Sequence, residues 1–220
     1  MVADLFFIGN GISVAYDYVK DGIWQDTPED KILRDKFSAN GQTFLPGSIK
    51  IRDLNGDFKI DANNDRQVLG RYTPSWTGGI TNTFNYKGFD LSVFIIARYN
   101  FLIATGAEAL QGRFAQRVLD YWTPTNPTND YPAPNYGSAA GDQFKSAMNY
   151  QDGSFIKVRN ISLGYNFAEN ITKKLTLSRL RVYAQMINPG LIYSKVKWID
   201  PDLGGSTFNR GVVFGINASF

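Results

Sequence analysis

Alternation of apolar and other residues is the feature that most constrains the fold of this chain. In its last stretch apolar side chains occupy every second position, namely Val212, Phe214, Ile216, Ala218 and Phe220. A period of two puts successive side chains on opposite faces of a β-strand. The same pattern predicts strands over residues 80–86, 89–100, 161–167 and 180–186. The sequence therefore predicts an all-β fold.

Local signals predict how these strands are connected. Lys87-Gly88 is a tight-turn signal, so residues 80–86 and 89–100 are expected to form an antiparallel hairpin. Gly78-Gly79, just before it, is expected to be a bulge or turn. A short helix is expected to begin at Glu29-Asp30, and helical spacing recurs over residues 107–121. The Pro- and Asn-rich residues 122–132 are predicted to be irregular.

The composition excludes several classes of chemistry. The chain contains no Cys and no His, which excludes disulfides, thiol nucleophiles, Ser-His-Asp triads and the common zinc and haem sites. No pair of carboxylates is positioned for glycosidase chemistry, so we expect that the protein is not an enzyme. The net charge of +3, from 23 Lys and Arg against 20 Asp and Glu, is too small to indicate a nucleic-acid partner.

Membrane helices are not expected either. The longest strongly apolar run, Val93–Ala97, is far shorter than the roughly 20 residues of a transmembrane helix. The chain is therefore either soluble or crosses a membrane as strands, and alternation alone leaves both open. Aromatic residues near strand ends are typical of the girdles of membrane barrels: Tyr86, Phe89, Tyr99, Tyr165 and Phe167. For an outer-membrane protein we expect a signal peptide on sequence outside this chain.

An acidic stretch is the one candidate for metal binding. Oxygen-bearing side chains occupy positions 1, 3, 5 and 9 of an EF-hand-like spacing: Asp53, Asn55, Asp57 and Asp61. Hard oxygens at this spacing are suited to Ca²⁺. The stretch departs from an EF-hand, because Phe58 replaces the turn glycine and Asn64 replaces the final glutamate. A calcium loop and a turn held by Asx side chains both remain open.

Short motifs follow one another in a recognisable order. They are Tyr18-Val19-Lys20-Asp21-Gly22-Ile23-Trp24, Pro46-Gly47-Ser48-Ile49-Lys50, Asp53-Leu54-Asn55-Gly56-Asp57, Pro74-Ser75-Trp76-Thr77-Gly78-Gly79, Tyr86-Lys87-Gly88-Phe89-Asp90-Leu91, Tyr121-Trp122-Thr123-Pro124, Asp152-Gly153-Ser154-Phe155-Ile156-Lys157 and Ile161-Ser162-Leu163-Gly164-Tyr165. Over about residues 16–220, this series resembles the C-terminal part of SusC-like (SusC/RagA-type) TonB-dependent outer-membrane transporters.

The resemblance implies a transmembrane antiparallel β-barrel segment. Residues 1–220 would be the C-terminal portion of the barrel, supplying roughly the last six to eight of about 22 strands, with long extracellular loops. The plug domain, the TonB box and the earlier strands would precede residue 1. The resemblance places the protein in the outer membrane of a Gram-negative bacterium.

The resemblance also implies a function and partners. The whole protein would import oligosaccharides or similar oligomeric nutrients, including peptides. A SusD-like surface lipoprotein would close over its extracellular mouth. The TonB complex would supply energy through the N-terminal region.

Residue roles follow from the same resemblance. The lipid-facing side chains would be Leu91, Val93, Ile95, Val212, Phe214 and Ile216. The lumen-facing ones would be Asp90, Arg98, Arg181 and Gln185, and the opposite phase of the strands remains open. The closing pattern resembles the signal by which the outer-membrane insertion machinery recognises a last strand: Phe214, Ile216, Ala218 and Phe220.

Two other interpretations compete with a transporter segment. The chain could form a complete small barrel of about eight strands that acts as an adhesin or structural protein. It could also be a soluble all-β carbohydrate-binding module that uses loop aromatics and a calcium loop. Its candidate aromatics are Trp24, Trp122, Tyr131 and Tyr136.

Overall fold

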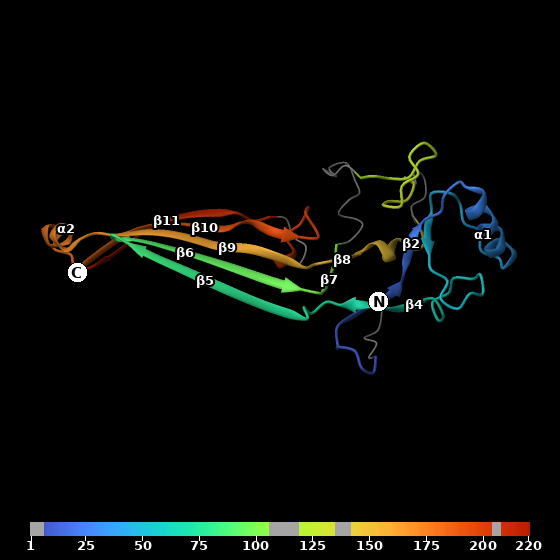
Figure 1. Ribbon diagram of the computed structural model, residues 1–220, viewed down its shortest axis with the longest axis horizontal. Helices are drawn as coiled ribbons and strands as arrows, with labels where there is room; N and C mark the ends of the chain where they lie inside the picture. Colours follow the sequence, from blue (N-terminus) through green and yellow to red (C-terminus); the bar gives the residue numbers. More distant parts are fainter. Residues whose placement is uncertain (1–6, 106–118, 135–141, 204–207) are drawn as a thin grey trace. The chain divides into compact units, whose positions relative to one another are not determined.

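The computed structural model describes residues 7–105, 119–134, 142–203 and 208–220 (Figure 1). The chain forms two compact units. The first comprises Met1–Tyr72 and Ala104–Gln151, and the second comprises Thr73–Ile103 and Asp152–Phe220. The second unit carries the long strands, and the first carries most of the shorter elements.

The second unit is built on one five-stranded antiparallel sheet. Its strands are β5 (Trp76–Tyr86), β6 (Phe89–Tyr99), β9 (Phe155–Asn166), β10 (Arg179–Ser194) and β11 (Gly211–Ser219). Their order across the sheet is β11-β10-β9-β6-β5 (Figure 1). Among these five strands, neighbours in the sheet are therefore also consecutive along the chain. All five segments predicted to be strands are strands, and the mostly β fold is confirmed.

Short connections lie at one end of this sheet and long ones at the other. Lys87 and Gly88 join β5 to β6 with positive φ values of 46° and 87°, the conformation of a tight hairpin turn. At the same end α2 (Glu169–Thr172) and η3 (Lys173–Leu175) join β9 to β10. At the opposite end residues 100–154 separate β6 from β9, and residues 195–210 separate β10 from β11. The predicted hairpin is confirmed.

Gly78 and Gly79 were expected to form a bulge or turn, and this prediction is wrong. Both lie inside β5, where they pair in regular register with Ala97 and Ile96. A Cβ at Gly78 would lie 2.5 Å from the Trp76 ring, and one at Gly79 would lie 2.9 Å from the Phe94 ring. These glycines therefore make room for aromatic rings that lie flat on the strands.

Among its described residues the first unit contains two small antiparallel sheets and one α-helix. In the sheets β1 (Val14–Tyr18) pairs with β4 (Arg66–Arg71), and β2 (Lys20–Ile23) pairs with β3 (Ile49–Ile51). A third two-stranded sheet joins β7 (Leu102–Ala104) to β8 (Tyr150–Asp152), after η2 (Lys145–Met148). A last short helix, η4 (Pro201–Leu203), belongs to the second unit.

Helix α1 (Pro28–Ala39) begins as its sequence predicts. Thr27 is the N-cap, and its hydroxyl oxygen accepts a hydrogen bond from the Asp30 amide at 3.3 Å. Pro28 occupies the first turn, where its missing N–H costs nothing. Most of the helical spacing over 107–121 falls on residues 106–118, which lie outside the described residues. No helix of the described residues is long and apolar enough to cross a membrane.

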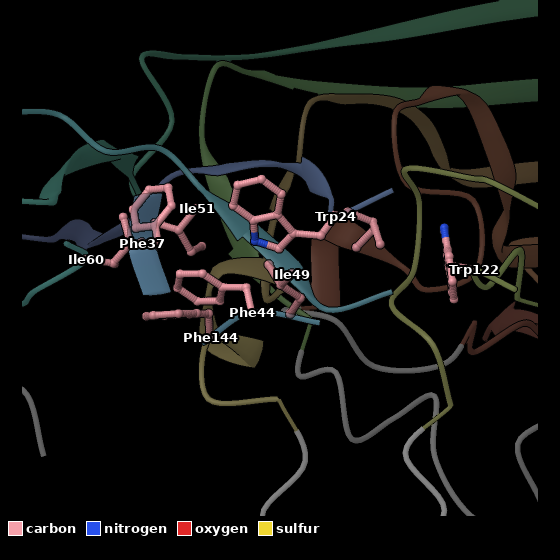
Figure 2. Packing of buried hydrophobic residues seen from close by; sticks show 9 residues of the cluster. Trp24, Phe37, Phe44, Ile49, Ile51, Ile60, Trp122 and Phe144 are labelled. Carbon is pink, nitrogen blue, oxygen red and sulfur yellow. The ribbon is translucent and has the colours of Figure 1, made fainter. Parts of the chain in front are cut away.

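An aromatic core holds the first unit together (Figure 2). Trp24 stacks on Phe44 with ring centroids 5.8 Å apart, and Phe37 meets both rings edge-on. Lys50 places its ammonium 4.4 Å from the centre of the Trp24 ring. Apolar side chains from β2, β3 and later segments complete the core: Ile23, Ile49, Ile51, Ile60, Trp122 and Phe144.

A separate core belongs to the second unit. It lies at the end of the sheet with the long connections, where residues from the β10–β11 connection pack against β6 and β9. Its buried members are Ile96, Phe101, Ile103, Phe155, Val196 and Ile199.

Candidate functional site: a sheet with two unlike faces

Apolar side chains share one face of the five-stranded sheet. Directly opposite residues of neighbouring strands point to the same side. Leu91 pairs with Phe84 on β5 and with Leu163 on β9, and Leu163 pairs with Ala184 on β10. Ala184 in turn pairs with Phe214 on β11. An apolar row therefore runs across all five strands.

The register places all six side chains predicted to face lipid on that one side. Val93 and Ile95 follow Leu91 along β6, and Val212 and Ile216 flank Phe214 along β11. The outer strands are the most exposed, with Phe214 79% and Ile216 70% accessible and Phe84 62%. Large exposed apolar patches mark surfaces that contact another protein or a membrane, so we expect this face to be covered.

Aromatic side chains band both ends of this face. Phe89 and Tyr165 lie at the short-turn end with ring centroids 4.7 Å apart, and Phe167 follows at 5.1 Å from Tyr165. At the opposite end Trp76 pairs with Tyr99, and both are more than half exposed. The sequence prediction included Tyr99 but missed Trp76, because it began the strand four residues too late.

The opposite face is polar, and an ion pair crosses its middle strand. Asp90 on β6 pairs with Gly164 on β9, and Arg181 on β10 pairs with Asn166, two positions further along β9. Arg181 donates two hydrogen bonds to the Asp90 carboxylate, of 2.5 Å from Nη2 and 3.0 Å from Nε, and Asn166 donates a third at 2.8 Å. A Cβ on Gly164 would lie 2.4 Å from the guanidinium. A glycine at position 164 is therefore required for the Arg181 side chain to cross β9 and reach Asp90.

Of the other residues predicted to face the lumen, Gln185 and Arg98 share this polar face. Gln185 pairs with Ser162 on β9, and Arg98 lies near the long-connection end of β6. Tyr183 lies flat over Gly215, where a Cβ would be 2.3 Å from the ring. The sequence predicts Arg98, Arg181 and Gln185 one by one as residues of this face, but only the strand register shows which side chains lie close together.

The β10–β11 connection folds onto the polar face through a cluster of charges that the sequence analysis missed. Lys157 on β9 is 1% exposed and lies 2.5 Å from Asp200 and 3.5 Å from Asp202. Arg98 and Arg159 also approach Asp202, at 3.5 and 3.7 Å. The only sequence signal for this cluster is the pair of acids in Asp200-Pro201-Asp202.

The proposed assembly signal lies on an edge strand. Within the described residues β11 pairs with β10 alone, and its Phe214, Ile216 and Ala218 share the apolar face. Phe220 follows the end of β11 and is 95% exposed. Recognition by an insertion machinery stays a prediction.

The acidic stretch is folded by its own side chains. Asp53 accepts hydrogen bonds from the Gly56 and Phe58 amides, and Asp57 accepts one from the Lys59 amide. Bonds from the Asn63 and Asn64 amides to the Asp61 carboxylate hold the pKa of Asp61 below its usual value. These are Asx-type turns, as in the second of the two interpretations.

The calcium loop itself stays a prediction. The described residues contain no group of three acidic side chains placed to hold one ion. Asp53, Asn55, Asp57 and Asp61 direct oxygens to backbone or neighbouring amides. A calcium titration that compares the native chain with Asp57→Asn would test the prediction.

Asp65 is the organising residue of this loop, and sequence reasoning missed it. Its side chain is fully buried and accepts hydrogen bonds from the Leu54 amide at 2.9 Å and the Asp61 amide at 2.7 Å. The two ends of the loop are thereby tied together. Asp65 lies one position beyond the EF-hand-like spacing, so that spacing gave no signal of this role.

Known proteins resemble this chain over most of its length. TonB-dependent receptor P3 of Formosa agariphila is 29% identical over 203 residues, which are 88% of this chain and 19% of that protein. TonB-dependent receptor P26 of the same organism is 33% identical over 77% of this chain and 17% of its own length. The chain is homologous to a part of the TonB-dependent receptors. The resemblance drawn from the order of the motifs is therefore confirmed.

Further relatives agree. TonB-dependent receptor SusC of Bacteroides thetaiotaomicron is 28% identical over 69% of this chain and 15% of its own length. The chain thus spans less than a fifth of the length of these relatives. No protein-family model matches the chain.

Solved structures show the same fold. The RagAB peptide importer in its open-open state superposes with a TM-score of 0.65 at 20% identity, over 94% of this chain and 22% of that chain. Its closed-closed state gives a TM-score of 0.60. At this level of identity the likeness establishes the fold alone, which is that of a segment of a receptor barrel.

Proposed function

We propose that the chain is a wall segment of an outer-membrane importer of oligomeric nutrients in a Gram-negative bacterium. The observation that carries this proposal is the apolar face, which runs across five antiparallel strands and is exposed on the outer ones. A lipid bilayer is the cover that such a face fits. Strands β5 and β6, of 11 residues each, match the roughly 9–11 residues of a tilted transmembrane strand.

The free edges support a larger, closed sheet. Among the described residues β5 and β11 each pair on one side only, although both are long and regular. Exposed edges of this kind promote aggregation, and a closed barrel removes them. In our proposal further strands of the same protein occupy these two edges.

The two ends of the sheet suggest its orientation. Outer-membrane barrels have short periplasmic turns and longer extracellular loops. By this rule the Lys87–Gly88 turn and α2 are periplasmic, and the long connections from β6 to β9 and from β10 to β11 are extracellular.

Substrate and partners belong to the same proposal. The relatives' names support TonB as the energy source. In our proposal TonB acts through the N-terminal region, and a SusD-like lipoprotein is the surface partner. The substrate class in this proposal is an oligosaccharide or a peptide, and the name of one structural relative, a peptide importer, supports a peptide.

Membrane fractionation with intact-mass analysis tests the proposal. We expect a protein near 100 kDa or more in the outer-membrane fraction of the source, with peptides that continue upstream of Met1 (about 22 strands plus a plug require such a size). A protein of 24.6 kDa in the outer membrane would instead support the small complete barrel. The same mass in the soluble fraction would support a carbohydrate-binding module.

A further inference from the structure

The charge cluster under the β10–β11 connection has more cations than anions. Its cations are Arg98, Lys157 and Arg159, and its anions are Asp200 and Asp202. Lys157 is enclosed between the two carboxylates and donates a hydrogen bond to each, although Asp202 Oδ1 accepts none from the described residues. The two arginines therefore share only Asp202, and the cluster keeps one positive charge in excess.

Only the cationic part of this cluster is accessible. The side chains of Lys157, Asp200 and Asp202 are each 1% exposed, whereas Arg98 is 32% and Arg159 is 44% exposed. A molecule that approaches the polar face therefore meets two guanidinium groups and neither carboxylate.

A β-bulge brings the second arginine to this position. Phe94 pairs with Asn160 but its neighbour Ile95 pairs with Val158, so Arg159 is an extra residue on β9. The extra residue changes the alternation and turns Arg159 toward Asp202 on the polar face, where its Nε lies 3.7 Å from the carboxylate. Bulges commonly re-aim a side chain in this way, often beside functional sites.

The two arginines approach Asp202 without a short hydrogen bond to it. Arg98 lies 3.5 Å and Arg159 lies 3.7 Å from the carboxylate, and the Arg98 guanidinium also lies 6.0 Å from the centre of the Phe155 ring. Each planar guanidinium presents several donors in a fork that matches a carboxylate or sulfate group. Since both lie within 4 Å of one carboxylate, a single small anionic group can reach both.

From this arrangement we infer that Arg98 and Arg159 form a binding site for an anionic group of the transported oligomer. The inference rests on the proposed function, because that function makes the polar face the wall of the transport path. It adds a substrate class, namely an oligomer that carries carboxylate or sulfate groups. Lys157, Asp200 and Asp202 hold the two arginines in position.

Binding measurements on the whole protein, purified in detergent from outer membranes, test the inference. The acidic probes are tetragalacturonate and tetraglutamate, and their neutral counterparts are maltotetraose and tetraalanine. We expect at least one acidic probe to bind more tightly than its counterpart, and the one that does distinguishes a saccharide from a peptide source. Arg159→Gln and Arg98→Gln should each weaken that binding about tenfold, the usual effect of losing a charge-assisted hydrogen bond.

Two control variants make the result decisive. Arg179→Gln removes an arginine from the other end of the same face and should leave binding unchanged. Arg159→Lys keeps the charge, loses the fork and should show an intermediate loss. Heat-modifiable mobility on gels shows whether each variant is folded.

Equal affinity for acidic and neutral probes would overturn the inference. Unchanged binding of the acidic probe by folded Arg159→Gln and Arg98→Gln would overturn it as well. Neither result would contradict the proposed function, whose own test is the mass and membrane location of the protein.

Discussion

Gly164 offers the sharpest test of how the polar face is built. Replacing it with alanine would place a Cβ 2.4 Å from the Arg181 guanidinium, so that side chain must move away from Asp90. The pair is only 18% and 20% exposed and is bidentate. Its loss should lower the free energy of unfolding by about 1–3 kcal/mol.

Urea unfolding of the detergent-purified protein, followed by tryptophan fluorescence, measures this change. Gly190→Ala is the matched control, because Gly190 lies in the neighbouring strand β10 and a Cβ there has no neighbour within 4 Å. We expect its unfolding free energy to stay within about 0.5 kcal/mol of the native value.

A double-mutant cycle separates the ion pair from other effects of the alanine. In an Arg181→Met background the guanidinium is absent, so adding Gly164→Ala should cost much less than it does in the native protein. If Gly164→Ala cost the same in both backgrounds, the argument that glycine serves the Asp90–Arg181 pair would be refuted.

Three further predictions concern the apolar face, the acidic loop and helix α1. Phe214→Arg places a charge on the face proposed to meet lipid and should lower the free energy of unfolding in urea by about 2–4 kcal/mol. Val213→Arg, on the opposite face, should lower it much less. Equal losses in the two variants would argue against a bilayer cover. Asp65→Ala leaves the Leu54 and Asp61 amides without their hydrogen-bond acceptor and should lower the free energy of unfolding by about 1–3 kcal/mol. We expect faster proteolysis of the 53–65 loop in this variant, and unchanged proteolysis would contradict the role of Asp65. Burial raises the pKa of Asp30, but hydrogen bonds from Lys50 and the Gln25 amide outweigh burial and hold that pKa below its usual value. The stability that Asp30 contributes is therefore fully present above its unfolded pKa near 4 and is lost as the pH falls through its lower folded pKa, and Asp30→Asn should remove this acid dependence from the fluorescence-detected unfolding.

Strand positions were predictable because their signal is local. The period of two in residues 89–100 and 212–220 reports which side chains share a face, whatever the strand pairs with. The Lys87-Gly88 turn likewise depends on two residues, and the helix start at Thr27–Asp30 depends on four. Where the local signal was misread, as at Gly78-Gly79, the deciding contact came from Phe94 on another strand and from the Trp76 ring.

The functional residues were harder to predict because their partners are distant in sequence. Asp90 and Arg181 are 91 positions apart, and Lys157 and Asp200 are 43 apart. No spacing rule connects such residues, since the register of three strands decides whether they meet. The position of Arg159 was also not predictable. Alternation continued from Ile161 would place Arg159 on the apolar face, but the β-bulge turns it toward Asp202 on the polar face.

The sequence by itself determined the all-β character of the long strands, the division of each strand into an apolar and a polar side, and the resemblance to the TonB-dependent receptors. These follow from side-chain chemistry repeated at short range. Only the tertiary structure decided which strands pair beyond the β5–β6 hairpin, that two compact units form, and that Asp65, Gly164 and Lys157 organise their surroundings. Those outcomes depend on hydrogen-bond registers and on burial, which bring together groups that the chain keeps far apart.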